Sequence, residues 1–212
     1  MALEMCFRVL AEPGDNILIP RPCFIYKTWM AGCKIIDRLY NLDPSKDWDI
    51  DLQHMESQID EKTKAIVINN PSNPCGSIYS KDHIIDILKI AERHQIPIIA
   101  DEVYEHFVFP GNEYHSISSL SKNVPVLSCS GLTKRFLMPG IRVGWIIIHD
   151  RNDSFANIRQ GLHNICGRNF GPNSTVQRAL PAILENTPRE YLTNVMEKIA
   201  VSLCINCKDL FS

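Results

Sequence analysis

Three continuous runs of apolar residues constrain the fold of this 212-residue chain more than any other feature of its sequence. The runs are Ala65–Ile68, Ile96–Ala100 and Val124–Leu127, and the residues between them have helical or turn character. A strand covered on both faces gives such a continuous run, whereas a half-exposed strand alternates apolar and polar residues. Buried strands that alternate with helices are typical of a mostly parallel sheet between two layers of helices. The sequence therefore predicts an α/β fold with three layers, α/β/α.

The remaining elements follow the same alternation. Ser80 is a candidate N-cap for a helix in which Ile84, Ile87, Leu88 and Ala91 share one face. We expect further strands at Asn16–Pro20, Lys34–Tyr40 and Val143–His149. The other expected helices are Met1–Leu10, Phe24–Gly32, Leu52–Ile59, Ser154–Cys166, Ser174–Glu185 and Arg189–Phe211.

Polar segments follow each of the three buried-type strands. The turn-rich segment Asn69–Gly76 follows the first strand, Asp101 ends the second, and Lys134 comes shortly after the third. In parallel sheets the ligand lies beyond the carboxyl ends of the strands. We therefore expect these three parts of the chain to converge on one edge of the sheet.

Lys134 and Arg142 form a chemically suggestive pair. Pro139 and Gly140 lie between them and disfavour a continuous helix, so we expect Lys134 in a loop. A lysine amine forms a Schiff base with an aldehyde, and a guanidinium binds phosphate with two parallel hydrogen bonds. Pyridoxal 5'-phosphate carries both groups and is therefore the candidate cofactor. Taken alone, a Lys and an Arg in one loop are far more often ordinary solvated surface charges.

Other residues match the remaining needs of this cofactor. Asp101 is a candidate partner for the protonated pyridine nitrogen, and Lys134, once its amine is free, is a candidate general base. Asn73 and Tyr104 are candidate donors to the ring oxygen. Candidates for the phosphate are Arg142 and Thr133, and Phe24 is a candidate for stacking on the ring. Three of them also have a simpler interpretation: Asp101 as a helix cap or turn former, Asn73 as a turn former and Phe24 as part of the core.

Together these segments resemble the fold type I aminotransferases. The resemblance rests on Asn70-Pro-Ser-Asn-Pro-Cys-Gly76, Ala100-Asp-Glu-Val-Tyr104 and the Lys134–Arg142 segment, which agree in order and spacing as well as identity. It covers nearly the whole chain. Further matches, to the tyrosine aminotransferases within this family, are Asn69–Ser77, Lys134-Arg135, Gly144–Asp150, Gly171-Pro172 and Val176-Gln177.

The resemblance implies an aspartate aminotransferase-like large domain, a homodimer and pyridoxal 5'-phosphate as cofactor. It gives Lys134, Asp101 and Tyr104 the catalytic roles, and Asn73, Arg142 and Phe24 the binding roles described above. The implied reaction moves the amino group of L-tyrosine, or of a related aromatic amino acid, to 2-oxoglutarate, giving 4-hydroxyphenylpyruvate and glutamate. This reaction belongs to amino acid catabolism.

Two departures from the family pattern leave alternatives open. Gly131 stands where many relatives have a phosphate-binding Ser, and Ser130, one position away, is the remaining candidate. The chain also matches only the middle of the family's length. We therefore expect residues 1–186 to form a cofactor-binding domain without its N-terminal start, and 187–212 to begin a helix leading to an absent small domain. The alternatives are an inactive truncated form that keeps the cofactor-binding core, or a related enzyme such as an alanine aminotransferase or a carbon–sulfur lyase.

Composition excludes several other classes of protein. A net charge of −2 gives no reason to expect nucleic acid as a partner, and no apolar run reaches the ~20 residues that span a bilayer. The eight cysteines are scattered, and Cys204 and Cys207 have metal-ligand spacing without a second Cys or His pair nearby. We therefore expect no metal site, and a reducing, cytoplasmic location.

Overall fold

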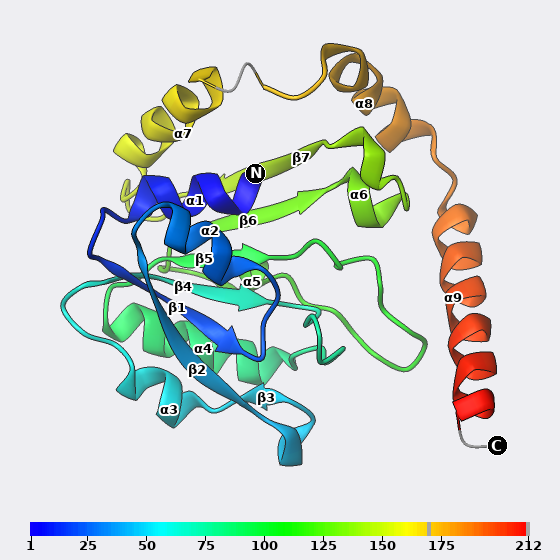
Figure 1. Ribbon diagram of the computed structural model, residues 1–212, viewed down its shortest axis with the longest axis horizontal. Helices are drawn as coiled ribbons and strands as arrows, with labels where there is room; N and C mark the ends of the chain where they lie inside the picture. The colour runs from blue at the N-terminus through cyan, green and yellow to red at the C-terminus, as the bar shows by residue number, and fades with distance from the viewer. Residues whose placement is uncertain (169–170, 211–212) are drawn as a thin grey trace.

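A seven-stranded sheet forms the centre of the computed structural model, which describes residues 1–168 and 171–210 (Figure 1). The strand order is β3-β2-β1-β4-β5-β6-β7. The strands are β1 (Asn16–Arg21), β2 (Ile36–Asp43), β3 (Asp49–Ile50), β4 (Thr63–Asn69), β5 (Ile98–Asp101), β6 (Val126–Gly131) and β7 (Gly144–His149). The α-helices are α1 (Ala2–Leu10), α2 (Tyr26–Gly32), α3 (Leu52–Ser57), α4 (Lys81–Arg93), α5 (Ile117–Leu120), α6 (Leu132–Arg135), α7 (Ala156–Arg168), α8 (Ser174–Asn186) and α9 (Arg189–Leu210), with 3-10 turns η1 (Pro44–Lys46) and η2 (Pro139–Ile141).

The five central strands run parallel, and both end strands run antiparallel to their neighbours. Strand β1 pairs with β2 and β4, β4 with β5, and β5 with β6, all in parallel. Strand β3 is antiparallel to β2, and β7 is antiparallel to β6. The prediction of a mostly parallel sheet is therefore confirmed.

Alternate residues of each central strand enter one of two separate cores, as the period of two in a strand requires. In β1, Leu18 packs in the core beneath α3, α4 and α5, whereas Ile17 and Ile19 pack beneath α1, α2 and α7. Figure 1 shows the two layers of helices on opposite faces of the sheet. Because both faces are covered, the strands carry the continuous apolar runs from which the sheet was predicted.

The covering helices present the apolar faces expected from the sequence. Helix α4 begins where predicted, because the Ser80 hydroxyl accepts a hydrogen bond from the His83 amide at 3.2 Å. Its buried stripe contains Ile84, Ile87 and Ala91. Among the described residues, no helix combines the length and the apolar character needed to cross a membrane.

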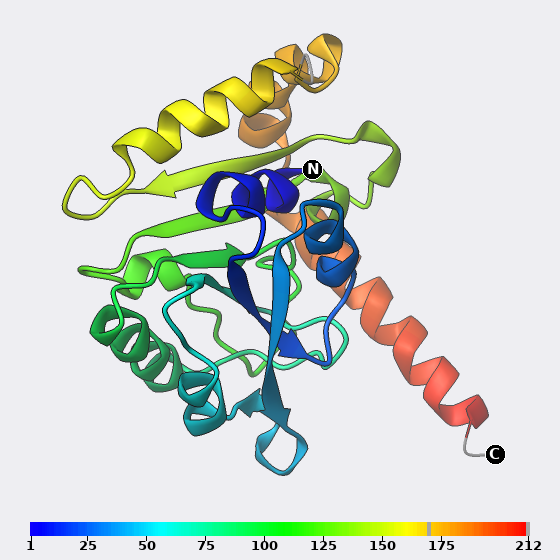
Figure 2. The same ribbon diagram turned by 60° about the vertical axis from the view of Figure 1, so that its left-hand side comes forward.

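The last two helices pack away from the main sheet. Helix α8 covers a small third cluster through Val176, Leu180 and Ile183, which contact Leu132, Phe136 and Val143. The Tyr191 hydroxyl at the start of α9 donates to the Phe136 carbonyl at 3.1 Å. Beyond this point α9 runs away from the layered part of the molecule (Figure 2).

Several expectations about local structure were wrong. Lys134 lies in the single-turn helix α6, not in a loop. Helix α2 begins at Tyr26, so Phe24 precedes it, and β2 begins at Ile36 instead of Lys34. Phe211, the expected end of the last helix, lies outside the described residues, as do the side chains of Cys204 and Cys207.

Candidate active site

The carboxyl ends of β4, β5 and β6 meet at one edge of the sheet. Their terminal residues are in register, with Asn69 beside Asp101 and Asp101 beside Cys129. The turn-rich segment 70–76, the loop from residue 102 onward and helix α6 all leave from this edge (Figure 1). The predicted convergence of these three parts of the chain is therefore present in the fold.

The Asp101 side chain is buried at this edge, with 6% of its surface exposed. Its Oδ2 accepts a hydrogen bond from the Tyr26 hydroxyl at 2.5 Å, and its Oδ1 accepts a longer one from the Val103 amide at 3.4 Å. Burial raises the pKa of Asp101, and the two hydrogen bonds act in the opposite direction. A carboxyl group held in this way suits pairing with a cationic ring nitrogen.

The amine of Lys134 lies over the ring of Tyr104, with Nζ 5.1 Å from the ring centroid. Both side chains are half-buried. Tyr104 follows Asp101 by three residues, and Lys134 follows β6 by three, so neighbouring strands bring an amine, a phenol and a carboxyl group to one edge. These are the groups that the sequence predicted around the cofactor.

Asn73 lies in a loop that is connected to β5 through the side chain of Asn69. The Asn73 amide donates to Asn69 Oδ1 at 2.7 Å, and Asn69 Nδ2 donates to the Asp101 carbonyl at 3.1 Å. The side chain of Asn69 therefore joins the loop to the strand that carries the acid.

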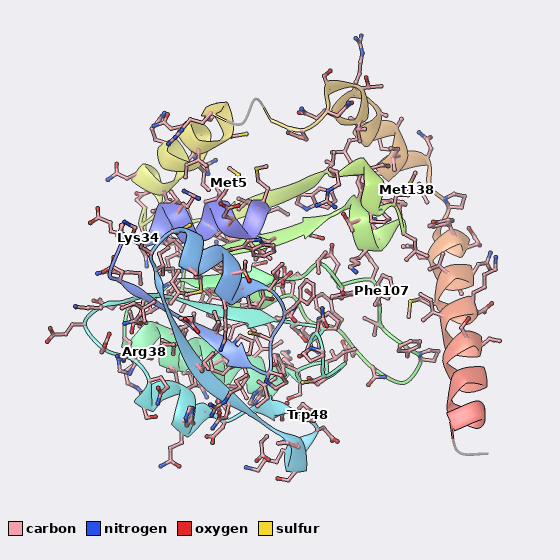
Figure 3. The ribbon with its side chains drawn as sticks, in the orientation of Figure 1. Met5, Lys34, Arg38, Trp48, Phe107 and Met138 are labelled. Atoms are coloured by element: carbon pink, nitrogen blue, oxygen red, sulfur yellow. The ribbon has the colours of Figure 1, made fainter. Side chains whose placement is uncertain are left out.

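A hollow of about 500 Å³ opens beside Asn73 and Tyr104. Its other lining residues include Phe107 and Phe109 from the loop after β5. Figure 3 shows Phe107 and Met138 beyond the same edge of the sheet; Met138 follows α6. Asn73 and Tyr104, predicted to share one ring oxygen, thus line the same opening.

The candidate phosphate residues differ in their surroundings. The Ser130 hydroxyl donates to Glu105 Oε1 at 2.9 Å. Thr133 is half-buried and directly precedes Lys134 on α6, whereas Arg142 is exposed and donates from Nη1 to the Pro139 carbonyl at 2.9 Å. Ser130 lies near the end of β6, and Thr133 and Arg142 lie on the segment that joins β6 to β7.

Gly131, the departure noted in the sequence, has a structural reason. A Cβ atom at this position would lie 2.8 Å from the Val143 carbonyl oxygen, because β6 and β7 approach closely here. A serine cannot replace Gly131 unless β7 shifts.

Phe24 is not grouped with the other candidates. Its side chain is 62% exposed, and it lines a separate hollow of about 520 Å³ together with Arg21, Pro22 and Lys27. Among the described contacts, none joins Phe24 to Asp101 or Lys134.

Sequence reasoning missed three residues that hold this site together. Tyr26 contacts the acid, Asn69 holds the loop, and Glu105 binds Ser130. Asn69 belongs to the segment that carried the family resemblance, which was a usable signal. Nothing in the local sequence marks Tyr26 or Glu105.

The fold and the site define the class of protein. Residues 1–202 match the sequence profile described as aminotransferase class I and II, and the chain belongs to this family. Membership of the family confirms the predicted fold class and the predicted cofactor, pyridoxal 5'-phosphate. The residues present fit this cofactor, since an amine and a buried carboxyl group lie at one sheet edge.

Within the family the chain is similar to tyrosine aminotransferases. It is 52% identical to the mouse tyrosine aminotransferase over 207 residues, which cover 96% of this chain and 46% of the mouse protein. A solved tyrosine aminotransferase from Leishmania infantum is 35% identical with a TM-score of 0.95, over 100% of this chain and 57% of that one. Alanine aminotransferase from Pyrococcus furiosus is 33% identical with a TM-score of 0.89, over 94% of this chain and 50% of that one. The chain thus spans about half the length of the relatives that it matches.

Proposed function

We propose that this chain forms the cofactor-binding part of an aminotransferase that acts on L-tyrosine or a related aromatic amino acid. The amino group would pass to 2-oxoglutarate, giving 4-hydroxyphenylpyruvate and glutamate in amino acid catabolism. The observation that carries the proposal is the meeting of Asp101, Tyr104 and Lys134 at the carboxyl edge of β5 and β6. Similarity to the mouse and Leishmania enzymes supports tyrosine as the substrate.

The proposed roles follow from the position of each side chain. When bound, pyridoxal 5'-phosphate supplies a carbonyl carbon open to attack by amines and a ring that takes up negative charge. Lys134 would hold the cofactor through its amine, and Asp101 would keep the ring nitrogen protonated by its negative charge. Asn73 and Tyr104 would donate to the ring oxygen.

Lys134 would also move the proton in the reaction. A free amine half-buried beside an aromatic ring is a competent base for a proton on the substrate carbon next to the nitrogen. Tyr104, with its ring 5.1 Å from the amine, would restrict where that amine lies. Arg142 and Thr133 would bind the phosphate, with Ser130 available only if Glu105 releases its hydroxyl. Phe24 would have to cover the ring from its exposed position before α2.

The test is an absorption titration of the purified protein with pyridoxal 5'-phosphate, followed by addition of tyrosine and 2-oxoglutarate. We expect a visible band on adding the cofactor, and its loss together with formation of 4-hydroxyphenylpyruvate on adding the substrates. Lys134→Ala should abolish the band, because no amine remains to hold the cofactor. The control is Lys89→Ala, which removes an exposed lysine that forms an ion pair with Asp86. A normal band in Lys134→Ala would refute the role of Lys134.

A second candidate is a related reaction on the same scaffold, or a chain that binds the cofactor without catalysis. The similarity to an alanine aminotransferase favours keeping alanine as an alternative substrate. Product analysis with tyrosine, alanine and cystine separates transamination of each amino acid from carbon–sulfur bond cleavage. A stable band with no product from any of them would indicate an inactive form.

We further propose a homodimer in the cytoplasm. Leu137 and Met138 are 50% and 48% exposed directly after α6, which supports a partner subunit on this side of the site. Six described cysteines are free, in keeping with a reducing compartment. Sedimentation of the protein and of Leu137→Glu tests the dimer: the variant should sediment as a monomer.

We also propose a domain boundary near residue 187. Residues 1–186 would form the cofactor-binding domain, and residues 187–212 would begin the connection to a second one. The course of α9 away from the layered part supports this division.

A further inference from the structure

Tyr26 is the residue that joins the covering helices to the candidate acid. It is the first residue of α2 and is 2% exposed, and its hydroxyl donates to Asp101 Oδ2 at 2.5 Å. Its ring meets Phe7 of α1 edge-on, with centroids 6.3 Å apart, and lies 6.4 Å from the ring of Trp29. Packing from two helices therefore fixes the direction in which this hydroxyl points.

Asp101 depends on this contact more than on any other. Of the described residues, only Tyr26 donates to Oδ2, and only the 3.4 Å contact from the Val103 amide reaches Oδ1. Asn69 binds the carbonyl of Asp101 and not its carboxylate. The other titratable neighbours are Glu102 and the Cys129 thiol, and neither supplies a positive charge. A buried carboxylate without a cation is stabilised by the hydrogen bonds made to it.

We propose that Tyr26 is a positioning residue for Asp101: its hydroxyl holds the carboxylate in the ionised form and leaves the remaining lone pairs directed toward the cofactor. A carboxylate offers about four acceptor positions, so the bonds from Tyr26 and Val103 leave acceptor capacity for a ring N–H. The inference rests on the proposed function only in naming the cofactor as the group that Asp101 faces.

The alternative is that Tyr26 serves the core alone. A buried hydroxyl needs a partner wherever it lies, so its hydrogen bond does not by itself show a functional role. Tyr40 provides the matched comparison, because it is equally buried and its hydroxyl donates to the Val67 carbonyl at 2.7 Å. Removing either hydroxyl leaves the ring in place and one buried acceptor without its donor, but only Tyr26 contacts Asp101.

The first experiment needs no cofactor. Infrared spectroscopy of protein carrying ¹³C-labelled aspartate follows protonation of Asp101, with Asp101→Asn identifying its band. Tyr26→Phe removes a hydrogen-bond donor to the charged form of Asp101. The midpoint pH of the Asp101 titration should therefore rise, with a roughly tenfold increase in proton affinity, whereas Tyr40→Phe should leave this midpoint unchanged. An unchanged midpoint in Tyr26→Phe overturns the inference. If Tyr26→Phe does not fold, the fallback is 3,5-difluorotyrosine in place of Tyr26. Its more acidic hydroxyl is the stronger donor, so the midpoint pH of the Asp101 titration should fall. An unchanged midpoint in this variant would then overturn the inference.

The second experiment measures the dissociation constant of pyridoxal 5'-phosphate in a double-mutant cycle. We expect Tyr26→Phe to weaken binding roughly tenfold when Asp101 is present and less than about twofold in the Asp101→Asn background. Tyr40→Phe should weaken it less than about twofold in either background. Equal losses for Tyr26→Phe in both backgrounds would overturn the inference and leave the proposed function standing. If the unaltered protein binds no cofactor while the Asp101 midpoint still moves in Tyr26→Phe, the proposed function fails and the control of Asp101 by Tyr26 stands.

Discussion

The acid side and the lysine side of the candidate site are built in opposite ways. Asp101 is 6% exposed at the end of a central strand, and its carboxylate and carbonyl are both hydrogen-bonded within the chain. On the lysine side, Leu137 and Met138 are about half exposed and Arg142 is exposed. The core of this chain thus fixes the acid, whereas the segment after Lys134 is left open. Changes near the acid should alter both chemistry and stability, and changes in the open segment should leave stability almost unaltered.

The largest expected effect comes from removing the charge of Asp101. Asp101→Asn keeps the size of the side chain and an acceptor for Tyr26, but it no longer stabilises a protonated ring nitrogen. Turnover should fall by roughly 10²–10³-fold, the usual cost of removing one directed electrostatic contact. Steady-state kinetics of the active protein measures this, and unaltered turnover would exclude the proposed role.

The same variant should affect stability in the opposite direction. Burial raises the pKa of Asp101 above its value in the unfolded chain, so the folded state binds the proton more tightly. The free energy of unfolding therefore falls as pH rises from about 4 through the folded-state pKa, and it stays lower at neutral pH. Without cofactor, Asp101→Asn should melt at a higher temperature than the unaltered protein at pH 7, and this advantage should disappear near pH 4. A lower melting temperature at pH 7 would contradict this reasoning.

Replacing Gly131 or Gly140, which lie on either side of Lys134, tests the contrast between the packed strand β6 and the open segment after Lys134. Gly131→Ala would place a Cβ atom 2.8 Å from the Val143 carbonyl, and overpacking of this kind costs up to about 3 kcal/mol. Gly140 has open space around its Cβ position, so Gly140→Ala should change the free energy of unfolding by less than about 0.5 kcal/mol. Denaturant titration measures both. Equal effects would show that the segment after Lys134 is packed as tightly as β6.

A smaller loss is expected when Asn69 is replaced. Asn69→Ala removes one buried and one partly buried hydrogen bond and leaves the Asn73 amide without its acceptor, at a cost of about 2 kcal/mol. Asn112→Ala is the control, because its exposed amide makes one weak contact with the Phe109 carbonyl at 3.3 Å. Thermal unfolding of the two variants provides the measurement, and a control as unstable as Asn69→Ala would contradict the role given to Asn69.

The smallest effect is a dependence on pH. Burial, reinforced by Arg135, lowers the pKa of His106 to about 4, and Glu105, 3.6 Å from its Nε2, is too far to reverse this by a hydrogen bond. The folded state then keeps this ring neutral while the unfolded chain binds a proton below about pH 6.5. The free energy of unfolding therefore falls as the pH is lowered from 6.5 to 4. At pH 5 the loss is about 1 kcal/mol after allowing for solvent screening. His106→Gln should lose less stability over this range, whereas replacement of the exposed His163 should change nothing.

The layered fold and the convergence of the site were predictable for one physical reason. Strands buried on both faces carry continuous apolar runs, and parallel neighbours such as β4, β5 and β6 must end at the same edge. This places residues 69, 101 and 134 together without any knowledge of side-chain contacts. Family resemblance then gave the chemistry of that edge.

The features that the sequence did not predict are a short helix and contacts between residues far apart in the chain. Helix α6 has only four residues, too few for a helical period to show in the sequence, so Lys134 was expected in a loop. Tyr26 lies 75 residues from Asp101, and no local pattern links a tyrosine at a helix start to an acid on a strand. The bond from Ser130 to Glu105 is of the same kind, since it connects β6 to the loop after β5 across 25 residues.

The side-chain amide of Asn69, which binds both Asn73 and Asp101, has a dynamic consequence. The loop and the end of β5 are connected through this amide and through the bond from the Asn70 amide to the Asp101 carbonyl, so a fluctuation that opens the loop also loosens the end of the strand. They should behave as one unit of local opening, with the Asn73 and Val103 backbone amides exchanging hydrogen at the same free energy. Thermal motion would then open or close this edge as a whole, and Asn73 and Asp101 would keep their mutual geometry for as long as the edge stays closed.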